Sequence, residues 1–137
     1  MTVETTELNL PSRIESVAEA AATVAIFVIR AGIAEEAAFG IDMAVREAVT
    51  NAVIHGNQQD ESKTVDLTLK SSPEGVEIIV HDQGPGFNPS EVPDPTKEEN
   101  LLKTSGRGIF FMRTFMDVVD WLKRPEGGTT VRMVKRR

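Results

Sequence analysis

The fold of this chain is decided by one stretch, "REAVTNAVIHG", residues 46–56. Most of its residues are small or branched and apolar, as in a helix that packs in a core, yet Glu47, Asn51 and His55 recur at every fourth position. Residues four apart on a helix lie on nearly one face, so these polar side chains form a stripe beside the apolar one. Taken alone, such a stripe is more often a solvated face than a functional site.

Length and composition are those of an ordinary globular domain. The chain has 137 residues, of which 40% are hydrophobic and 26% are charged, and this suits one domain over residues 1–137. The formal net charge of −6 argues against a direct nucleic-acid partner, because such proteins present a basic face. The sequence holds no cysteine, which excludes disulfides and thiolate metal sites.

The sequence predicts neither an export signal nor a membrane segment. Its first ten residues, "MTVETTELNL", are acidic and polar, unlike a secretory signal. The most apolar stretch, residues 20–29, is far shorter than the roughly 20 residues that a membrane helix needs. We interpret it as a buried helix and expect a cytoplasmic protein with no membrane partner.

The N-terminal half predicts one strand followed by two helices. Residues 5–10 alternate weakly between polar and apolar, as in a strand. Ser12 with Glu15 three positions later forms a capping box for a helix that runs to about residue 30. A second helix is predicted over residues 34–56, where a glycine followed by an asparagine is a C-cap signal.

The C-terminal half predicts two hairpins around a loop and a short helix. Residues 64–71 and 76–82 form the first hairpin, and residues 117–124 and 129–136 form the second. Between them, residues 105–116 read as a glycine-rich turn that opens into a helix. Since hairpins join most strands, we expect an α/β two-layer sandwich whose mixed, mostly antiparallel sheet has its helices on one face.

Two glycine-rich motifs add to the polar stripe. "DQGPGF" begins at Asp82, directly after a strand, and its glycines let the backbone approach a ligand closely. "SGRGIFF", residues 105–111, precedes a helix and offers backbone N–H groups to an anion. Singly, the first is also an ordinary Asp-Gly turn and the second a helix cap. Neither matches a phosphate loop ending in GK[ST] or a dinucleotide-binding GxGxxG turn.

In this order, and with "GTTV" at residues 128–131, the motifs resemble those of the GHKL superfamily of gyrases, chaperones, histidine kinases and mismatch-repair ATPases. The resemblance covers residues 8 to 134. Within the superfamily the chain looks most like the anti-sigma-factor serine kinases. Those proteins phosphorylate a serine of an anti-anti-sigma protein of the STAS fold, and otherwise hold a sigma factor inactive. The resemblance thus implies an ATP-dependent protein serine kinase that uses Mg²⁺ and forms a homodimer.

The resemblance also implies roles for single residues. Glu47 would be the general base and Asn51 the Mg²⁺ ligand, while His55 would lie near the phosphates or simply cap the helix end. Asp82 would bind the adenine amine, with Thr129 supporting the same edge. The remaining nucleotide-binding positions would be the backbone groups and side chains of the two glycine motifs, namely Gly84, Gly86, Ser105, Gly106, Arg107 and Gly108.

Several features of this assignment stay open. Arg107 stands where many GHKL members have a small or aliphatic residue, and it either contacts phosphate or points to solvent. Residues 88–104 would form a lid over ATP. The first helix lacks the arginine by which some anti-sigma relatives contact a partner, so its sigma-binding surface is unassigned. A histidine kinase would need a further helical domain, and the ATP-binding unit already uses all of residues 1–137.

One alternative from another class is a nucleotide-sensing binding module, which would bind ATP or ADP and a partner protein without transferring phosphate. Glu47 favours the kinase, because a pure binder has no need of a carboxylate beside the γ-phosphate.

Overall fold

The computed structural model describes residues 3–84, 112–123 and 127–137. The expected order of strands and helices is confirmed, with residues 112–115 forming the short helix before the second hairpin. The elements are β1 (Glu4–Pro11), α1 (Glu15–Arg30), α2 (Glu35–Asn51), the π turn η1 (Ala52–Gly56), β2 (Thr64–Ser72), β3 (Gly75–His81), β4 (Val118–Lys123) and β5 (Thr129–Arg136).

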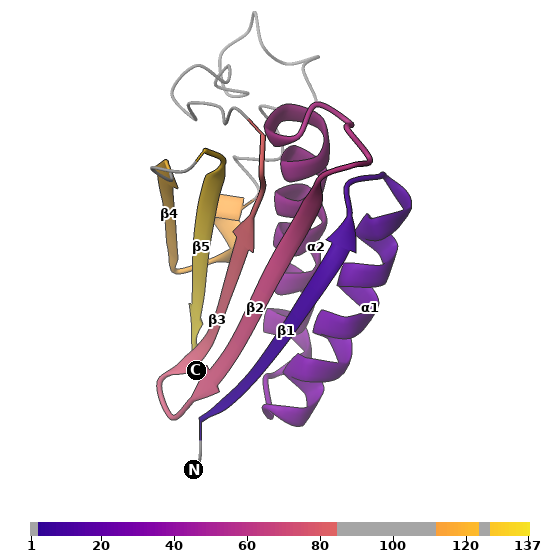
Figure 1. Cartoon of the computed structure of the whole chain (residues 1–137). Helices are drawn as coiled ribbons and strands as arrows, with labels where there is room; N and C mark the ends of the chain where they lie inside the picture. Colours follow the sequence, from indigo (N-terminus) through magenta and orange to yellow (C-terminus); the bar gives the residue numbers. More distant parts are fainter. Residues whose placement is uncertain (1–2, 85–111, 124–126) are drawn as a thin grey trace, which may run out of the picture.

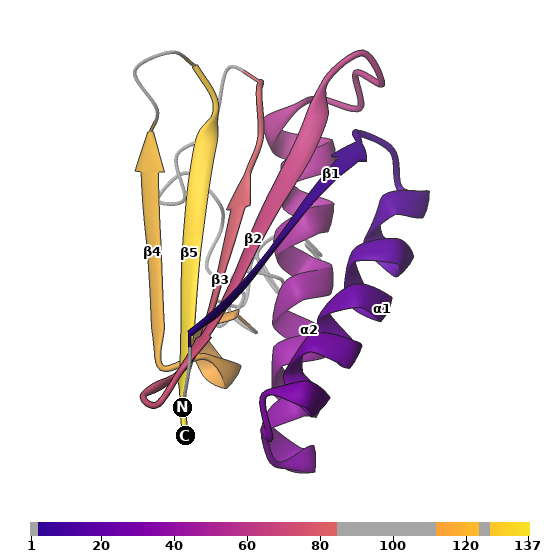
Figure 2. The ribbon, with the colours of Figure 1, turned by 60° about the horizontal axis from the view of Figure 1, so that its bottom comes forward.

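The five described strands form one sheet in the order β1-β2-β3-β5-β4, and every neighbouring pair is antiparallel. Both long helices cover the same face of this sheet (Figures 1 and 2). The predicted two-layer sandwich is therefore confirmed, with a sheet that is antiparallel rather than mixed over the described strands. No helix in the described ranges is long and apolar enough to span a membrane.

The core lies between the sheet and the two long helices. Across all five strands, one row of side chains faces the helices, because the residues stand opposite one another in the strand register: Leu8, Leu67, Val80, Val131 and Trp121. On α2, Ile41, Val45 and Val49 have no exposed surface. Each such side chain stabilises the fold by about 1.5–3 kcal/mol when fully buried.

The start of the first helix differs from the prediction. Ser12 is fully buried and its Oγ accepts a hydrogen bond of 3.0 Å from Asn57 Nδ2. The helix α1 instead begins at Glu15, and no side chain caps its first turn. The capping-box prediction was wrong, because the Ser12 hydroxyl is used in a bond to a residue 45 positions away.

The end of the second helix is placed as predicted but is built differently. After Asn51 the helix widens into the π turn η1, which the Asn57 N–H closes on the carbonyl of Ala52 at 2.8 Å. The residues with positive φ that follow are Gln58 and Gln59, at 53° and 59°. A glycine C-cap was therefore the wrong explanation for residue 56, and such π turns are frequent at functional sites.

Candidate functional site

Asp82 is the most constrained polar residue of the predicted site. It directly follows β3, and its side chain is buried although the residue is acidic. Its Oδ1 accepts hydrogen bonds from the N–H of Thr129 at 3.0 Å and of Gly84 at 3.2 Å. Its own N–H donates to the Thr129 carbonyl at 3.0 Å. Because β3 and β5 are neighbours in the sheet, the strand order itself brings Asp82 and Thr129 together.

Three glycines from different segments pack around this carboxylate. A Cβ at Gly56 would lie 2.2 Å from Asp82 Oδ2, and a Cβ at Gly84 would lie 1.6 Å from the Gly56 carbonyl oxygen. Gly128 has a φ of +95°, and a Cβ there would lie 2.1 Å from the Asp82 carbonyl oxygen. A Cβ at Gly84 or Gly128 would require the backbone to move, and a Cβ at Gly56 would require the Asp82 side chain to move. Within the described residues, the close approach that Gly84 permits is to Gly56, at the end of η1.

Asn57 holds the turn that carries Asp82, although in the sequence it stands out only as part of a helix-end signal. Its fully buried side chain donates from Nδ2 to the carbonyl of Thr64 at 2.9 Å and to Ser12 Oγ at 3.0 Å. Its Oδ1 accepts from the N–H of Gln83 at 2.7 Å. The turn after β3 is thereby fixed to the end of the second helix. The nearest sequence signal was the position of Asn57, directly after the polar stripe.

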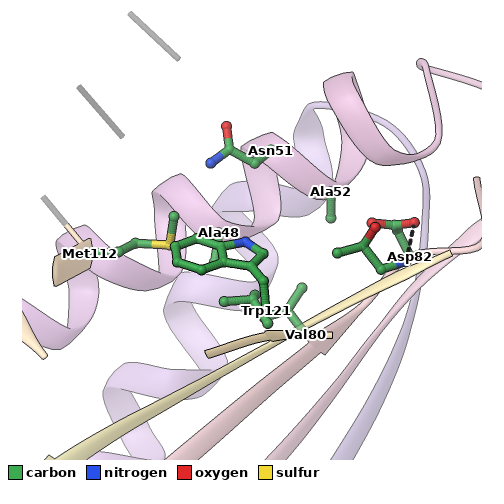
Figure 3. Close-up of a pocket in the computed structure, with 9 residues that line it drawn as sticks. Ala48, Asn51, Ala52, Val80, Asp82, Met112 and Trp121 are labelled. Atoms are coloured by element: carbon green, nitrogen blue, oxygen red, sulfur yellow. Dashed lines mark hydrogen bonds between the residues drawn. The ribbon is translucent and has the colours of Figure 1, made fainter. Parts of the chain in front are cut away.

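A pocket opens between the second helix and the sheet, beside Asp82 (Figure 3). Its walls are mostly apolar with a few polar groups, the composition that small-molecule sites usually have. The described residues that line it are Ala48, Asn51, Ala52, Val80, Asp82, Met112, Trp121, Thr129 and Val131. The free space inside is about 10 Å³, which is room for one water molecule.

Asn51 brings an unsatisfied polar group to this pocket. The residue is only 4% exposed, and its Nδ2 has no hydrogen-bond partner among the described residues. A buried polar atom without a partner costs roughly 1–3 kcal/mol, and in native proteins such an atom calls for a functional explanation, such as a water or an ion that binds there. Half a turn of the amide exchanges its oxygen and nitrogen, so the same side chain can face a donor or a cation. The polar groups present therefore fit a bound nucleotide and its metal.

Glu47 and His55, the other members of the predicted stripe, do not line the pocket. Both are partly buried, and burial raises the pKa of the Glu47 carboxyl. His55 lies in the π turn, so it is no longer one regular α turn from Asn51. No cluster of three potential metal ligands among histidine, aspartate and glutamate occurs within the described part of the chain. Among the described residues that line the pocket, Asn51 is the side chain placed to help hold a metal together with the ligand.

The other predicted site positions cannot be placed. Gly86, Ser105, Gly106, Arg107 and Gly108, like the expected lid at residues 88–104, lie outside the described residues. Their assignments stay predictions from the sequence.

Trp121 is the residue that sequence reasoning missed. It lies on β4 opposite Val131, and its indole sits between the second helix and Val80, with Met112 at one end (Figure 3). The guanidinium of Arg113 covers the ring at 5.3 Å from its centroid. The signal in the sequence was the single tryptophan of the chain, within a strand whose alternate residues face inward.

Comparison with known proteins agrees with this geometry. The sequence model of the histidine kinase-like ATPase domain matches residues 10–135, and the chain belongs to that family. Within the family it belongs with the anti-sigma F factors. The one from Clostridium perfringens is 40% identical over 100 residues, which span 70% of each protein. That of Anoxybacillus flavithermus is 37% identical over 117 residues, or 82% of this chain and 79% of that protein. The Bacillus cereus protein is 35% identical over the same shares.

Proposed function

We propose that this chain binds Mg·ATP and transfers its γ-phosphate to a serine of a STAS-domain anti-anti-sigma protein, and that it also binds a sigma factor. The observation that carries nucleotide binding is the buried Asp82 carboxylate, which accepts a hydrogen bond from the N–H of Thr129 and lines a mostly apolar pocket. A buried acceptor of this kind recognises an exocyclic amine, as on adenine. The relatives named anti-sigma F factors support the partner classes.

Two residues of the second helix have separate roles in the proposed reaction. Asn51 supplies the amide oxygen that helps to hold Mg²⁺, whose role when bound is to neutralise charge on the phosphates. Glu47, one helical turn earlier, accepts the proton of the partner's serine. The serine oxygen then bonds to the γ-phosphorus, the bond from that phosphorus to the β,γ-bridging oxygen breaks, and ADP leaves. The burial that raises the pKa of Glu47 makes it a stronger proton acceptor.

The decisive experiment incubates the chain with labelled ATP and STAS-domain proteins from the same genome, and identifies phosphoserine by mass spectrometry. We expect Glu47→Ala to keep ATP affinity and to slow single-turnover transfer by roughly 10²–10⁴-fold. Asn51→Ala should lose Mg²⁺-dependent affinity and transfer together. Asp42→Asn is the matched control, because Asp42 is a carboxylate of the same helix that pairs with Arg46 at 3.0 Å and lies outside the pocket.

The alternative of a nucleotide-sensing module makes a different prediction for the same assay. Such a protein binds ATP and its partner, but no phosphoserine appears with any STAS protein, and Glu47→Ala changes nothing. We also propose a homodimer, which light scattering on the purified chain would test.

A further inference from the structure

The pocket beside Asp82 is too small for the ligand that we assign to it. Its free space is about 10 Å³, whereas sites for ligands of nucleotide size measure roughly 300–1,000 Å³. The polar end is already assembled around Asp82, with its hydrogen bonds to Thr129 and Gly84 in place. A nucleobase that reaches Asp82 therefore needs room at the apolar end.

Most of the described apolar residues that line the pocket cannot move aside to make room, because they are short or tightly packed. Ala48 and Ala52 are short side chains of the second helix, each at most 4% exposed, and Val80 is 1% exposed on a central strand. Val131 lies on β5, which is bonded to a strand on each side. Shifting any of these residues would disturb the close packing of the core.

Trp121 differs from these residues in size, exposure and support. It carries the largest side chain in the pocket, and it is only half-buried. Among the described strands, its strand β4 stands at the edge of the sheet and pairs with β5. One face of the indole is covered by the exposed Arg113, and an exposed cation–π contact is weak. In Figure 3 the ring lies between the second helix and Val80.

We propose that the Trp121 indole occupies the volume that the nucleobase takes, and that it must turn out of the pocket when nucleotide binds. Trp121 then sets the affinity of the site, because part of the binding free energy goes into displacing the ring. The inference rests on the proposed function, since it requires a nucleobase in this pocket. The opposite role, a fixed platform on which the base stacks, predicts the opposite effect of removing the ring.

Fluorescence tests the movement directly. The chain has one tryptophan and no tyrosine, so emission excited at about 295 nm comes from Trp121 alone. We expect saturating Mg·ADP to shift this emission to longer wavelength as the indole enters water, and to increase its quenching by iodide. Tripolyphosphate with Mg²⁺ carries no base and should leave both unchanged. If calorimetry detects ADP binding while emission and quenching stay constant, the ring does not move and the proposal fails.

Calorimetric titration of ADP into variants tests the effect on affinity. Trp121→Val keeps a residue suited to a strand and should bind ADP about three- to tenfold more tightly than the parent, since the displaced contacts are gone. Trp121→Phe should fall between the two. Leu122→Ala is the matched control, because Leu122 is the next residue of β4, is 59% exposed and does not line the pocket. Its affinity should equal that of the parent.

The outcomes separate this inference from the proposed function. If the parent binds ADP and a folded Trp121→Val or Trp121→Phe binds it equally or more weakly, the indole is a supporting wall and only this inference is overturned. If neither the parent nor the variants bind ADP or ATP, nucleotide binding itself is refuted and the inference falls with it.

Discussion

Replacing Asp82 by Asn tests the centre of the proposed site, because it changes one charge and almost no volume. In the parent, Oδ1 accepts two backbone hydrogen bonds, at 3.0 Å from Thr129 and 3.2 Å from Gly84. An asparagine can keep its oxygen at this position, so both bonds survive with a neutral acceptor. A bond to a charged group contributes about 1.5–3 kcal/mol, against about 0.5–1.5 kcal/mol for a neutral one. The expected loss of unfolding free energy is therefore about 2 kcal/mol.

The loss of ATP affinity should be distinct from this loss of stability. The Nδ2 of the asparagine is a donor. It would face the amine of adenine, which is also a donor, where the parent offers the acceptor Oδ2. Losing that bond to a charged group costs about 1.5–3 kcal/mol, which corresponds to roughly ten- to a hundredfold weaker binding. GTP should lose less, because guanine carries a carbonyl oxygen where adenine carries its 6-amine.

Two measurements on the same samples separate these effects. Urea unfolding gives the change in stability, and calorimetric titration of Mg·ATP at a temperature where both proteins are folded gives the change in affinity. Asp42→Asn again serves as the control, since it removes an α2 carboxylate that is paired with Arg46 outside the pocket. If Asp82→Asn binds ATP as tightly as the parent, the assignment of Asp82 to the base is wrong, whatever happens to stability.

Three further changes test residues along the second helix and its last turn. Gly56→Ala places a Cβ 2.2 Å from Asp82 Oδ2. Because hydrogen bonds hold that carboxylate, we expect weaker ATP binding and a loss of about 1–3 kcal/mol in unfolding free energy. An unchanged midpoint of urea unfolding would contradict the packing argument. Asn51→Ala removes a buried amide whose Nδ2 has no hydrogen-bond partner among the described residues, so it should raise the melting temperature without nucleotide. With Mg·ATP the order should reverse, and the parent should melt at the higher temperature. Thermal scans under both conditions measure this. Glu47 has a raised folded-state pKa, so its contribution to stability is present at low pH and is lost as the pH rises from the ordinary pKa of 4.5 through the folded-state pKa. The unfolding free energy of Glu47→Gln should match that of the parent near pH 4 and exceed it at pH 8. A difference in urea unfolding that does not change with pH would refute this.

The elements of the fold were predictable because each has a periodic pattern of its own. The alternation of Val65, Leu67 and Leu69 marks β2 as a strand with one buried face, and all three are at most 1% exposed. Ile41 and Val45 mark the buried face of α2 in the same way. These patterns are local, and hairpins then leave few ways to order the strands.

The predictions failed where a residue's role depends on a distant partner. Ser12 has the local signature of a helix cap, but its hydroxyl oxygen accepts a hydrogen bond from Asn57, which lies 45 residues further along the chain. Gly56 has the signature of a C-cap, yet it is needed because the Asp82 side chain packs against it. Trp121 lies in a correctly predicted strand. Its place in the pocket follows only from the register of β4 with β5, which no local pattern specifies.

The polar end of the pocket is already arranged for a ligand, whereas the apolar end must rearrange before a base can bind. At the polar end, Asp82 is fixed by Thr129, by Gly84 and, through Gln83, by Asn57. A ligand that binds there meets groups already in position, so little ordering free energy is lost. At the apolar end, the Trp121 indole must leave before a base can enter. Affinity should then respond strongly to changes at residue 121. The preference for adenine, with its 6-amine, over guanine, with its 6-carbonyl, should respond to residue 82. A Trp121→Val protein that binds ADP more tightly with an unchanged preference over GDP would demonstrate that separation, and a variant that shifts both together would show that one wall controls affinity and base choice alike.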